Sequence, residues 1–316
     1  MSTKPTIAVI GSINIDLVTY TPRVPRGGET LTAHGFSVGL GGKGANQAVA
    51  CAKVSRTKTD VQDGTVVVKM VGAVGDDNYG GVITSGLRDV GIDTGDILVR
   101  EDKKTGAAVI VVESETAENR IMFCPEANAT MRPEQFADDL PRPLPDLLIM
   151  QMEIPLETVT QILMTAKRLG VPVLLNPAPA LKIEEKYYPC ITHLVVNETE
   201  AAILSGCSVE ELESQDGRAR VAKIFHDLGV EYVLVTLGSR GVYYSVSGKV
   251  QGHVEAQKVT AVDTTAAGDT FVGVYAVEVV KGDFDVEKAV QLANRAASKT
   301  VLKKGAQESI PWRDEL

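Results

Sequence analysis

After Pro145 the sequence alternates between short apolar runs and longer stretches with helical periodicity, joined by short links. Apolar runs such as 147–150 and 193–196 have the length of buried strands, and the stretches between such runs are long enough for helices. Strands that alternate with helices in this way form a parallel sheet covered by helices on both faces. The predicted fold class is therefore α/β, a three-layer α/β/α core with a mostly parallel sheet.

The first half of the chain shows a different pattern. A buried strand at 7–10 is followed by short alternating stretches that proline and glycine interrupt, which favours a small antiparallel layer. A second hairpin is expected further on, with a polar turn at 113–118. We expect the segments at about 13–40 and 105–125 to pair into a small β-sheet that covers the edge of the main sheet as a lid. The chain 1–316 is thus expected to be a single domain that carries this lid.

Several further elements follow from the same patterns. A glycine run followed by alanines indicates a helix at 41–52, and polar residues indicate a surface loop at 53–64. The remaining predictions are strands at 66–74, 171–175 and 232–236 and helices at 79–90, 156–169, 200–204, 218–228, 268–280 and 286–302.

Composition limits the class of protein. Hydrophobic residues make up 44% of the 316 residues, which is enough for a sizeable core. The net charge of −9, with Lys and Arg scattered along the chain, disfavours a nucleic-acid partner. No run approaches the roughly 18 apolar residues that cross a bilayer, so no membrane partner is expected either. The apolar strand begins so early that a signal peptide has no room, and we expect a cytoplasmic protein.

The strongest chemical signal is the segment 262–271, where small residues join a strand-like segment to an apolar helix. The backbone amides of Ala266, Ala267 and Gly268 would lie unpaired at the helix N-terminus. Such amides bind anions and suit the negative charge on a phosphoryl group in transfer. Asp269 follows directly and is a candidate base for a hydroxyl placed against these amides. An alternative is that Asp269 only stabilises the helix dipole.

A second signal is the glycine-rich segment 39–46, which includes Gly42, Lys43 and Asn46. It matches the spacing of a dinucleotide-binding loop, but no acidic residue ends the next strand. It also fails as a Walker A loop, because Gly44 follows Lys43 where Ser or Thr would stand. The two remaining interpretations are a turn against which a hydroxylated ligand lies and a purely structural turn.

Three further segments combine polar side chains with strand ends. Asn14 and Asp16 alternate with isoleucines, so both point to one face and suit a vicinal diol, or they form a turn. Asn197 and Glu200 could organise Mg²⁺, but the motif taken alone favours a helix-capping pair. The turn at 236–241 lies where α/β folds bind ligands, although a hairpin would also need such a turn.

Taken together, these segments resemble the ribokinase branch of the phosphofructokinase-B family of carbohydrate kinases. The resemblance runs from Gly11 to about Trp312. The segments that carry it are GSINID at 11–16, GGKGANQAVA at 41–50, NPAPA at 176–180, NETE at 197–200, TLGSRG at 236–241, DTTAAGD at 263–269 and KGAQ at 304–307.

The resemblance implies an ATP-dependent kinase that phosphorylates D-ribose at its 5-hydroxyl, with ATP and D-ribose as partners. Asp269 falls on the catalytic base, and Ala266 to Gly268 fall on the anion hole. The positions that match the ribose site are Asn14, Asp16, Gly42, Lys43, Asn46, Glu153 and Asp269. The positions that match the ATP site are Asn197, Thr236, Gly238, Ser239, Gly241, Gly268 and Asn294.

The resemblance also implies two cations and a homodimer. Glu200 falls on the acidic residue that organises Mg²⁺ indirectly. A monovalent cation, normally K⁺, activates members of this branch, and an oxygen-only set of ligands suits it. Its matching positions are Asp263, Thr265, Thr300, Lys303, Gly305 and Ser309. Members often form dimers through the lid.

The sequence departs from the family pattern at Thr265, where isoleucine is frequent, at 125–126 in the lid, and at 55–64, which is longer than usual. None of these changes removes a predicted catalytic group.

The alternative functions are a kinase of another pentose, of deoxyribose or of a nucleoside, and a non-catalytic sugar or nucleotide sensor on the same fold. A nicotinamide-dependent oxidoreductase has only the glycine spacing in its favour.

Overall fold

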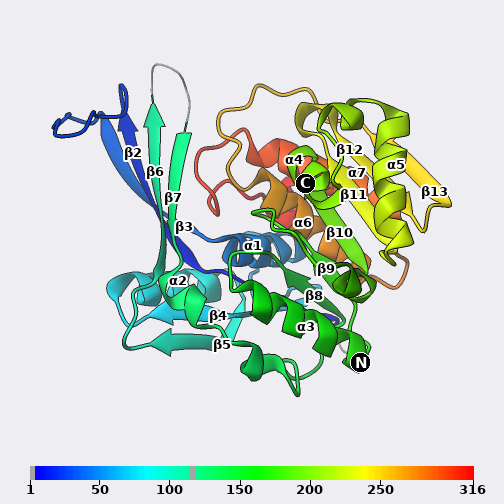
Figure 1. Ribbon diagram of the computed structural model, residues 1–316. Coiled ribbons are helices and arrows are strands. Elements are labelled where there is room, and N and C mark those ends of the chain that lie inside the picture. The colour runs from blue at the N-terminus through cyan, green and yellow to red at the C-terminus, as the bar shows by residue number, and fades with distance from the viewer. Residues whose placement is uncertain (1–3, 114–118) are drawn as a thin grey trace.

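The computed structural model describes residues 4–113 and 119–316. Within these residues, nine strands form one large sheet and four strands form a second, smaller sheet that projects from the main body (Figure 1). In order across the large sheet, its strands are β13 (Val250–Val254), β12 (Val242–Val246), β11 (Tyr232–Thr236), β10 (His193–Asn197), β9 (Val173–Leu175), β8 (Leu147–Met150), β1 (Thr6–Ile10), β4 (Val67–Gly75) and β5 (Asp93–Arg100).

The large sheet is mostly parallel, as the sequence predicts. From β11 to β5 every neighbouring pair is parallel, and only β12 and β13 add antiparallel pairs at one edge. The chain first adds β4 and β5 on one side of β1 and then returns to add β8 on the other side. The order of strands therefore reverses between β1 and β8, and α/β sheets bind ligands beyond the carboxyl ends of the strands at such a point.

Helices cover both faces of this sheet, because its central strands are apolar on both sides. Ile7 and Val9 of β1 belong to one buried cluster, whereas Ala8 and Ile10 belong to the other. The first cluster includes residues of α1 (Lys43–Ser55), α2 (Asn78–Asp89), α6 (Ala267–Val279) and α7 (Val286–Thr300). The second includes residues of α3 (Leu156–Leu169), α4 (Glu198–Ser205) and α5 (Gln215–Asp227). The predicted three-layer core is thus confirmed.

The small sheet consists of β3 (Gly35–Gly41), β2 (Asn14–Thr21), β6 (Gly106–Glu113) and β7 (Asn119–Cys124), in this order. Two antiparallel hairpins join through the parallel pair β2–β6, and their bounds fall within the two segments predicted to form a lid. Residues 114–118 of the expected turn lie outside the described residues.

The structure corrects several predicted elements. The sequence prediction does not include strands β5, β12 and β13. The strands β5 and β13 lie at the two edges of the large sheet, where polar residues such as Asp93, Asp96 and Gln251 mask the apolar pattern. Strand β12 lies between β11 and β13 and is mostly buried. The stretch just before Asp263, expected to be strand-like, is not a strand. The predicted surface loop also begins too early, because Lys53 and Ser55 still belong to α1 and are buried.

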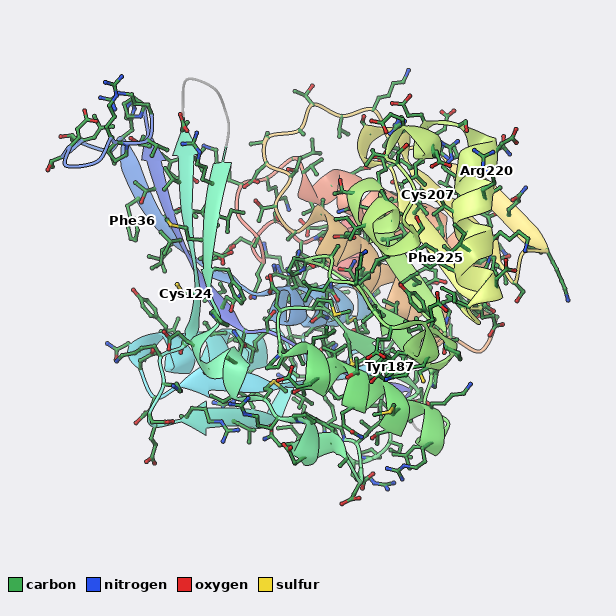
Figure 2. All side chains as sticks on the ribbon, viewed as in Figure 1. Phe36, Cys124, Tyr187, Cys207, Arg220 and Phe225 are labelled. Atoms are coloured by element: carbon green, nitrogen blue, oxygen red, sulfur yellow. The ribbon has the colours of Figure 1, made fainter. Side chains whose placement is uncertain are left out.

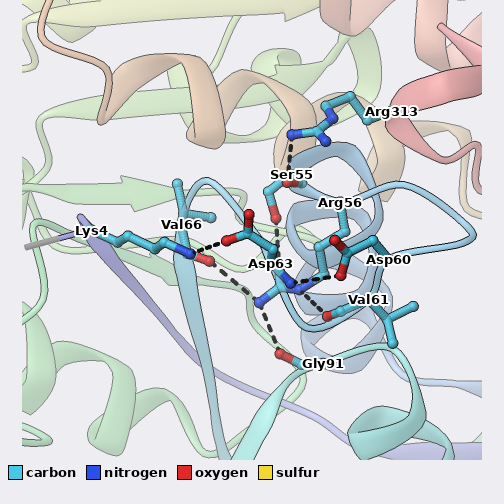
Figure 3. Close-up of polar contacts among 9 residues, drawn as sticks. All are labelled: Lys4, Ser55, Arg56, Asp60, Val61, Asp63, Val66, Gly91 and Arg313. Carbon is cyan, nitrogen blue, oxygen red and sulfur yellow. Dashed lines mark hydrogen bonds and ion pairs between the residues drawn. The ribbon is translucent and has the colours of Figure 1, made fainter.

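Arg56 organises the loop that follows α1 (Figure 3). Its side chain is only 5% exposed. The guanidinium group donates hydrogen bonds to the hydroxyl of Ser55 and to main-chain carbonyls of Ala52, Val61, Val66 and Gly91. One side chain therefore ties the end of α1, the loop, the segment before β4 and the end of α2 together.

We predict that Arg56→Leu lowers the free energy of unfolding by about 2–4 kcal/mol, because several buried carbonyl groups lose their donor. Arg313→Gln serves as the control, since Arg313 is exposed and its guanidinium donates a hydrogen bond to Ser55 O. This control should change the free energy by less than about 0.5 kcal/mol. Urea unfolding measures both, and equal effects of the two substitutions would contradict this role of Arg56.

Candidate active site

The site is built where β1 and β8 end. Just beyond β8, the carboxylate of Glu153 accepts hydrogen bonds at Oε2 from the Ser12 hydroxyl (2.6 Å) and from the backbone N–H of Lys43 (3.1 Å). The Asn14 amide nitrogen lies 3.5 Å from the same oxygen. Glu153 therefore joins the segment after β1 to the start of α1.

The glycine-rich segment packs directly on backbone, which explains its composition. A Cβ on Gly44 would lie 2.7 Å from backbone atoms of Gly11 and Ser12, and one on Gly42 would lie 2.7 Å from Asn14 N. Gly42 also has a φ of 88°, which side chains disfavour. The structural-turn alternative is therefore confirmed, whereas a hydroxylated ligand against this turn stays a prediction.

Asn128 fixes the direction of the Asn14 amide, and no sequence pattern pointed to this residue. This fully buried residue lies in the short 3₁₀ helix Glu126–Thr130 after the small sheet. Its Nδ2 donates to Asn14 Oδ1 (2.8 Å) and to Ile13 O (3.2 Å), and its Oδ1 accepts from Ile13 N (3.0 Å). The amide nitrogen of Asn14 is therefore the group that remains to donate to Glu153 or to a ligand.

Asp269 lies in the first turn of α6 and is 7% exposed. Its Oδ2 accepts from Asn46 Nδ2 (3.1 Å), and its Oδ1 accepts from Gln47 Nε2 (2.9 Å). The Oδ1 atom of Asn46 is buried and has no partner among the described residues, so an acceptor is left over beside the carboxylate. The structure therefore unites the two strongest sequence signals, which lie more than two hundred residues apart in the chain. Gln47 was missed as a partner of Asp269.

The N-terminus of α6 agrees only in part with the predicted row of unpaired amides, because the Ala267 N–H donates to Thr264 O (3.3 Å). Ala266, the residue before the helix, has a φ of 59°, and a Cβ on Gly268 would meet nothing within 4 Å. Gly268 and Ala267 border a cavity of about 450 Å³. The same cavity is lined by Thr236, Gly238, Ser239, Gly241 and Asn294, which are the predicted ATP-site residues apart from Asn197. Asn294 donates from Nδ2 to Glu255 O (2.9 Å).

Asn197 and Glu200 form the helix-capping pair that the sequence left open. Asn197 Oδ1 accepts from Glu200 N (2.8 Å), and Glu200 Oε2 accepts from Asn197 N (2.9 Å). Burial raises the pKa of Glu200, and the nearby charge of Asp269 adds to this effect. Asn197 is not among the residues that line the cavity. Its prediction as an ATP ligand therefore rests on the resemblance alone.

The predicted K⁺ ligands come partly together. The Asp263 carboxylate accepts from Thr265 N (2.9 Å), from the Thr265 hydroxyl (2.6 Å) and from Gly305 N (3.0 Å). Burial opposes ionisation of Asp263, but these hydrogen bonds outweigh it and lower the pKa. The Ser309 hydroxyl instead donates to Ala306 O (2.7 Å). Thr300 O accepts from Lys303 N (3.1 Å). Only oxygen ligands are offered here, which fits a hard cation.

Charge is concentrated around Lys43. Burial opposes its positive charge, but the carboxylates of Asp269, Glu153, Glu200 and Asp16 outweigh burial and raise the pKa of Lys43. Burial raises the pKa of Asp16 from 3.8 to about 7, and the charges of Glu153 and Asp269 add to the shift. Asp16 is thus much harder to ionise than an ordinary aspartate.

We predict that Asp16→Asn stabilises the protein in a pH-dependent way. The folded protein keeps Asp16 protonated up to about pH 7, whereas the unfolded chain ionises it near 3.8. Ionisation of Asp16 in the unfolded chain therefore lowers the stability of the wild type as the pH rises through this window. Thermal unfolding should show no gain for Asp16→Asn below about pH 4 and a gain of several degrees above about pH 7. A gain that is constant across this range would contradict the crowding of these carboxylates.

Comparison with known proteins shows the family of the chain. Residues 4–313 match the family described as pfkB family carbohydrate kinase. A ribokinase of Schizosaccharomyces pombe is 43% identical, over 96% of this chain and 94% of that protein. A deoxyribokinase of Salmonella typhi is 38% identical, over 96% of this chain and 95% of that protein.

A solved structure is similar over nearly the whole chain. The structure of Arabidopsis thaliana ribokinase complexed with ribose and ATP superposes with a TM-score of 0.87 at 31% identity, covering 99% of this chain and 97% of that one. The fold, the site at the carboxyl edge of the sheet and these relatives lead to one assignment. The chain belongs to the pfkB family of carbohydrate kinases.

Proposed function

We propose that this chain is a ribokinase, which transfers the γ-phosphoryl group of ATP to the 5-hydroxyl of D-ribose. One observation carries the proposal: Asp269 follows Gly268, which lines the large cavity, and accepts a hydrogen bond from Asn46 of the glycine-rich turn. A nucleotide in the cavity and a sugar against the turn would meet at this carboxylate. The ribokinases among the relatives support ribose as the sugar.

The residues suit direct transfer of the phosphoryl group. Asp269 takes the proton of the attacking hydroxyl, whose oxygen forms a bond to the γ-phosphorus while the bond to the bridging oxygen of ADP breaks. The backbone N–H groups of Ala266 and Gly268 donate to the phosphoryl oxygens as charge spreads over them, and that of Ala267 joins them by exchanging its bond to Thr264 O. Asn14, Asp16 and Glu153 hold the sugar hydroxyl groups.

Two cations fit residues of this site. Mg²⁺ bound with ATP balances the phosphate charge, and Glu200, a buried acid beside Lys43, is the residue that would organise it. K⁺ would bind the oxygens around Asp263 and Gly305 and thereby fix the loop before α6.

No helix among the described residues is both long and apolar enough to cross a bilayer. We infer a cytoplasmic enzyme that acts on free sugar.

ADP formation from Mg-ATP tests the proposal across ribose, 2-deoxyribose, other pentoses and nucleosides, in K⁺ or Na⁺. We expect the highest kcat/KM for D-ribose, a higher rate in K⁺, and no rate in EDTA. Asp269→Ala should lower kcat by about 10²- to 10⁴-fold, the range for loss of a general base.

Preference for 2-deoxyribose would keep the mechanism and replace the substrate, in line with the deoxyribokinase relative. ATP binding without turnover on any sugar would favour a sensor and overturn the proposal.

The small sheet also supports a homodimer. In the sheet register Phe36 lies opposite Thr19, and Val38 and Met122 share a row with Leu17, so these three apolar side chains lie on one face. They are exposed by 63%, 48% and 56%, and Figure 2 shows Phe36 on the side turned away from the main body. Such a row of apolar side chains fits a second copy of the chain.

We predict that the double variant Phe36→Glu with Met122→Glu is a monomer in sedimentation, because two buried charges would face each other across the interface. Ser37→Glu is the control: it lies on the opposite face of the same strand and is exposed. It should remain a dimer. A wild-type protein that is monomeric at high concentration would refute the dimer.

A further inference from the structure

A chain of buried side-chain amides runs behind Asp269. Gln47 and Gln151 are fully buried, and Asn176 is 9% exposed. Gln151 Nε2 donates to Gln47 Oε1 (2.7 Å), and Gln47 Nε2 donates to Asn176 Oδ1 (3.0 Å) and to Asp269 Oδ1 (2.9 Å). Asn176 Nδ2 in turn donates to Val195 O (2.9 Å). The ends of β8 and β9, a carbonyl of β10 and two helices thus converge on one carboxylate.

The direction of each amide follows from chemistry. The carbonyl of Val195 only accepts, so Asn176 must present its nitrogen to it and its oxygen to Gln47. Gln47 must then present its nitrogen, and its two hydrogens point to Asn176 and Asp269. Its oxygen is left to accept from Gln151. No amide in the chain can turn over without breaking a buried hydrogen bond.

Stability alone does not account for this arrangement. Gln151 Oε1 is buried and has no partner in the described part of the chain, which is destabilising. This Gln151 oxygen lies only 2.0 Å from the point where a Cβ on Gly11 would be. The arrangement of Gln151 therefore depends on glycine at position 11. An apolar side chain at 151 would avoid the unpaired oxygen, but it would leave Gln47 Oε1 without its donor.

We propose that Gln47 is a positioning residue for phosphoryl transfer, whose amide, locked by Gln151 and Asn176, holds the Asp269 carboxylate in its proton-accepting orientation. Asn46 holds the other carboxylate oxygen, so two consecutive residues of α1 fix both oxygens. Each oxygen keeps a further lone pair for the sugar hydroxyl. This inference rests on the proposed function, because it gives Asp269 the role of base.

The kinetics of Gln47→Leu on D-ribose with Mg-ATP test the proposal. Leu has a similar size but no donor, so we expect kcat to fall about ten- to a hundredfold, the equivalent of one hydrogen bond to a charged group. The KM for ribose should change less than about threefold, because Gln47 does not touch the sugar. Loss of a donor disfavours a charged carboxylate. The acid limb of kcat, followed from about pH 5 to about pH 9, should therefore move to higher pH.

Other charges near Asp269 stay the same in this variant. Asp16, Lys43 and Glu200 all interact with its carboxylate, and none of them is altered. Thr158→Val is the matched control, since its buried hydroxyl donates to Met131 O on the other face of the sheet. It should lose stability but keep the wild-type kcat and pH profile.

Gln151→Met provides a second variant if Gln47→Leu does not fold. It removes the donor to Gln47 and leaves both groups at Asp269 in place, so we expect a smaller fall in kcat, several-fold, with a shift of the acid limb in the same direction. Wild-type kinetics in the folded variant, or a fall in kcat with an unchanged pH profile, would overturn the positioning role. If the wild type does not phosphorylate ribose, the proposed function is wrong. If the wild type is active and Asp269→Ala is inactive, the proposed function holds, and the Gln47 variants then test the positioning role alone.

Discussion

Four carboxylates surround a single ammonium group at the carboxyl edge of the large sheet. Asp269, Glu153, Glu200 and Asp16 all raise the pKa of Lys43, and the most crowded of them, Asp16, has its own pKa raised to about 7. This cluster is tolerated because most of its members accept hydrogen bonds from well-placed donors. A nucleotide brings further negative charge to the same place. The N-terminus of α6 and a divalent cation are the means available to balance that charge.

The fold brings this cluster together by a few close contacts. The reversal of strand order between β1 and β8 opens the site, and the glycine turn packs against backbone atoms after β1. Helices α1 and α6 approach closely because Gly273 faces Ala50, where a Cβ would come within 2.4 Å of the alanine side chain. This approach lets Asp269 reach the first turn of α1. The glycine-rich turn, Asp269 and the cavity therefore lie in one packed unit, from which the small sheet projects.

Much of this organisation could be predicted from the sequence, because it depends on local patterns. The apolar runs gave the central strands, and the small residues before Asp269 gave the helix N-terminus that borders the cavity. Edge strands such as β5 were missed, since solvent on one side allows polar residues to interrupt the alternation. The partners Asn128 and Gln47 could not be predicted, because their bonds to Asn14 and Asp269 span more than a hundred residues and depend on tertiary packing. The Asn197–Glu200 pair shows the converse, as its local capping role was predicted and forms.

We propose that phosphoryl transfer takes place at Asp269. Single-turnover transfer of labelled γ-phosphate from Mg-ATP to D-ribose tests it most directly, with the wild type compared with the isosteric Asp269→Asn and with ribose and ATP binding measured in parallel. We predict that labelled ribose phosphate forms in the wild type and that Asp269→Asn binds both substrates but transfers at least about a hundredfold more slowly. Transfer by Asp269→Asn within about threefold of the wild-type rate would contradict the assignment of the base.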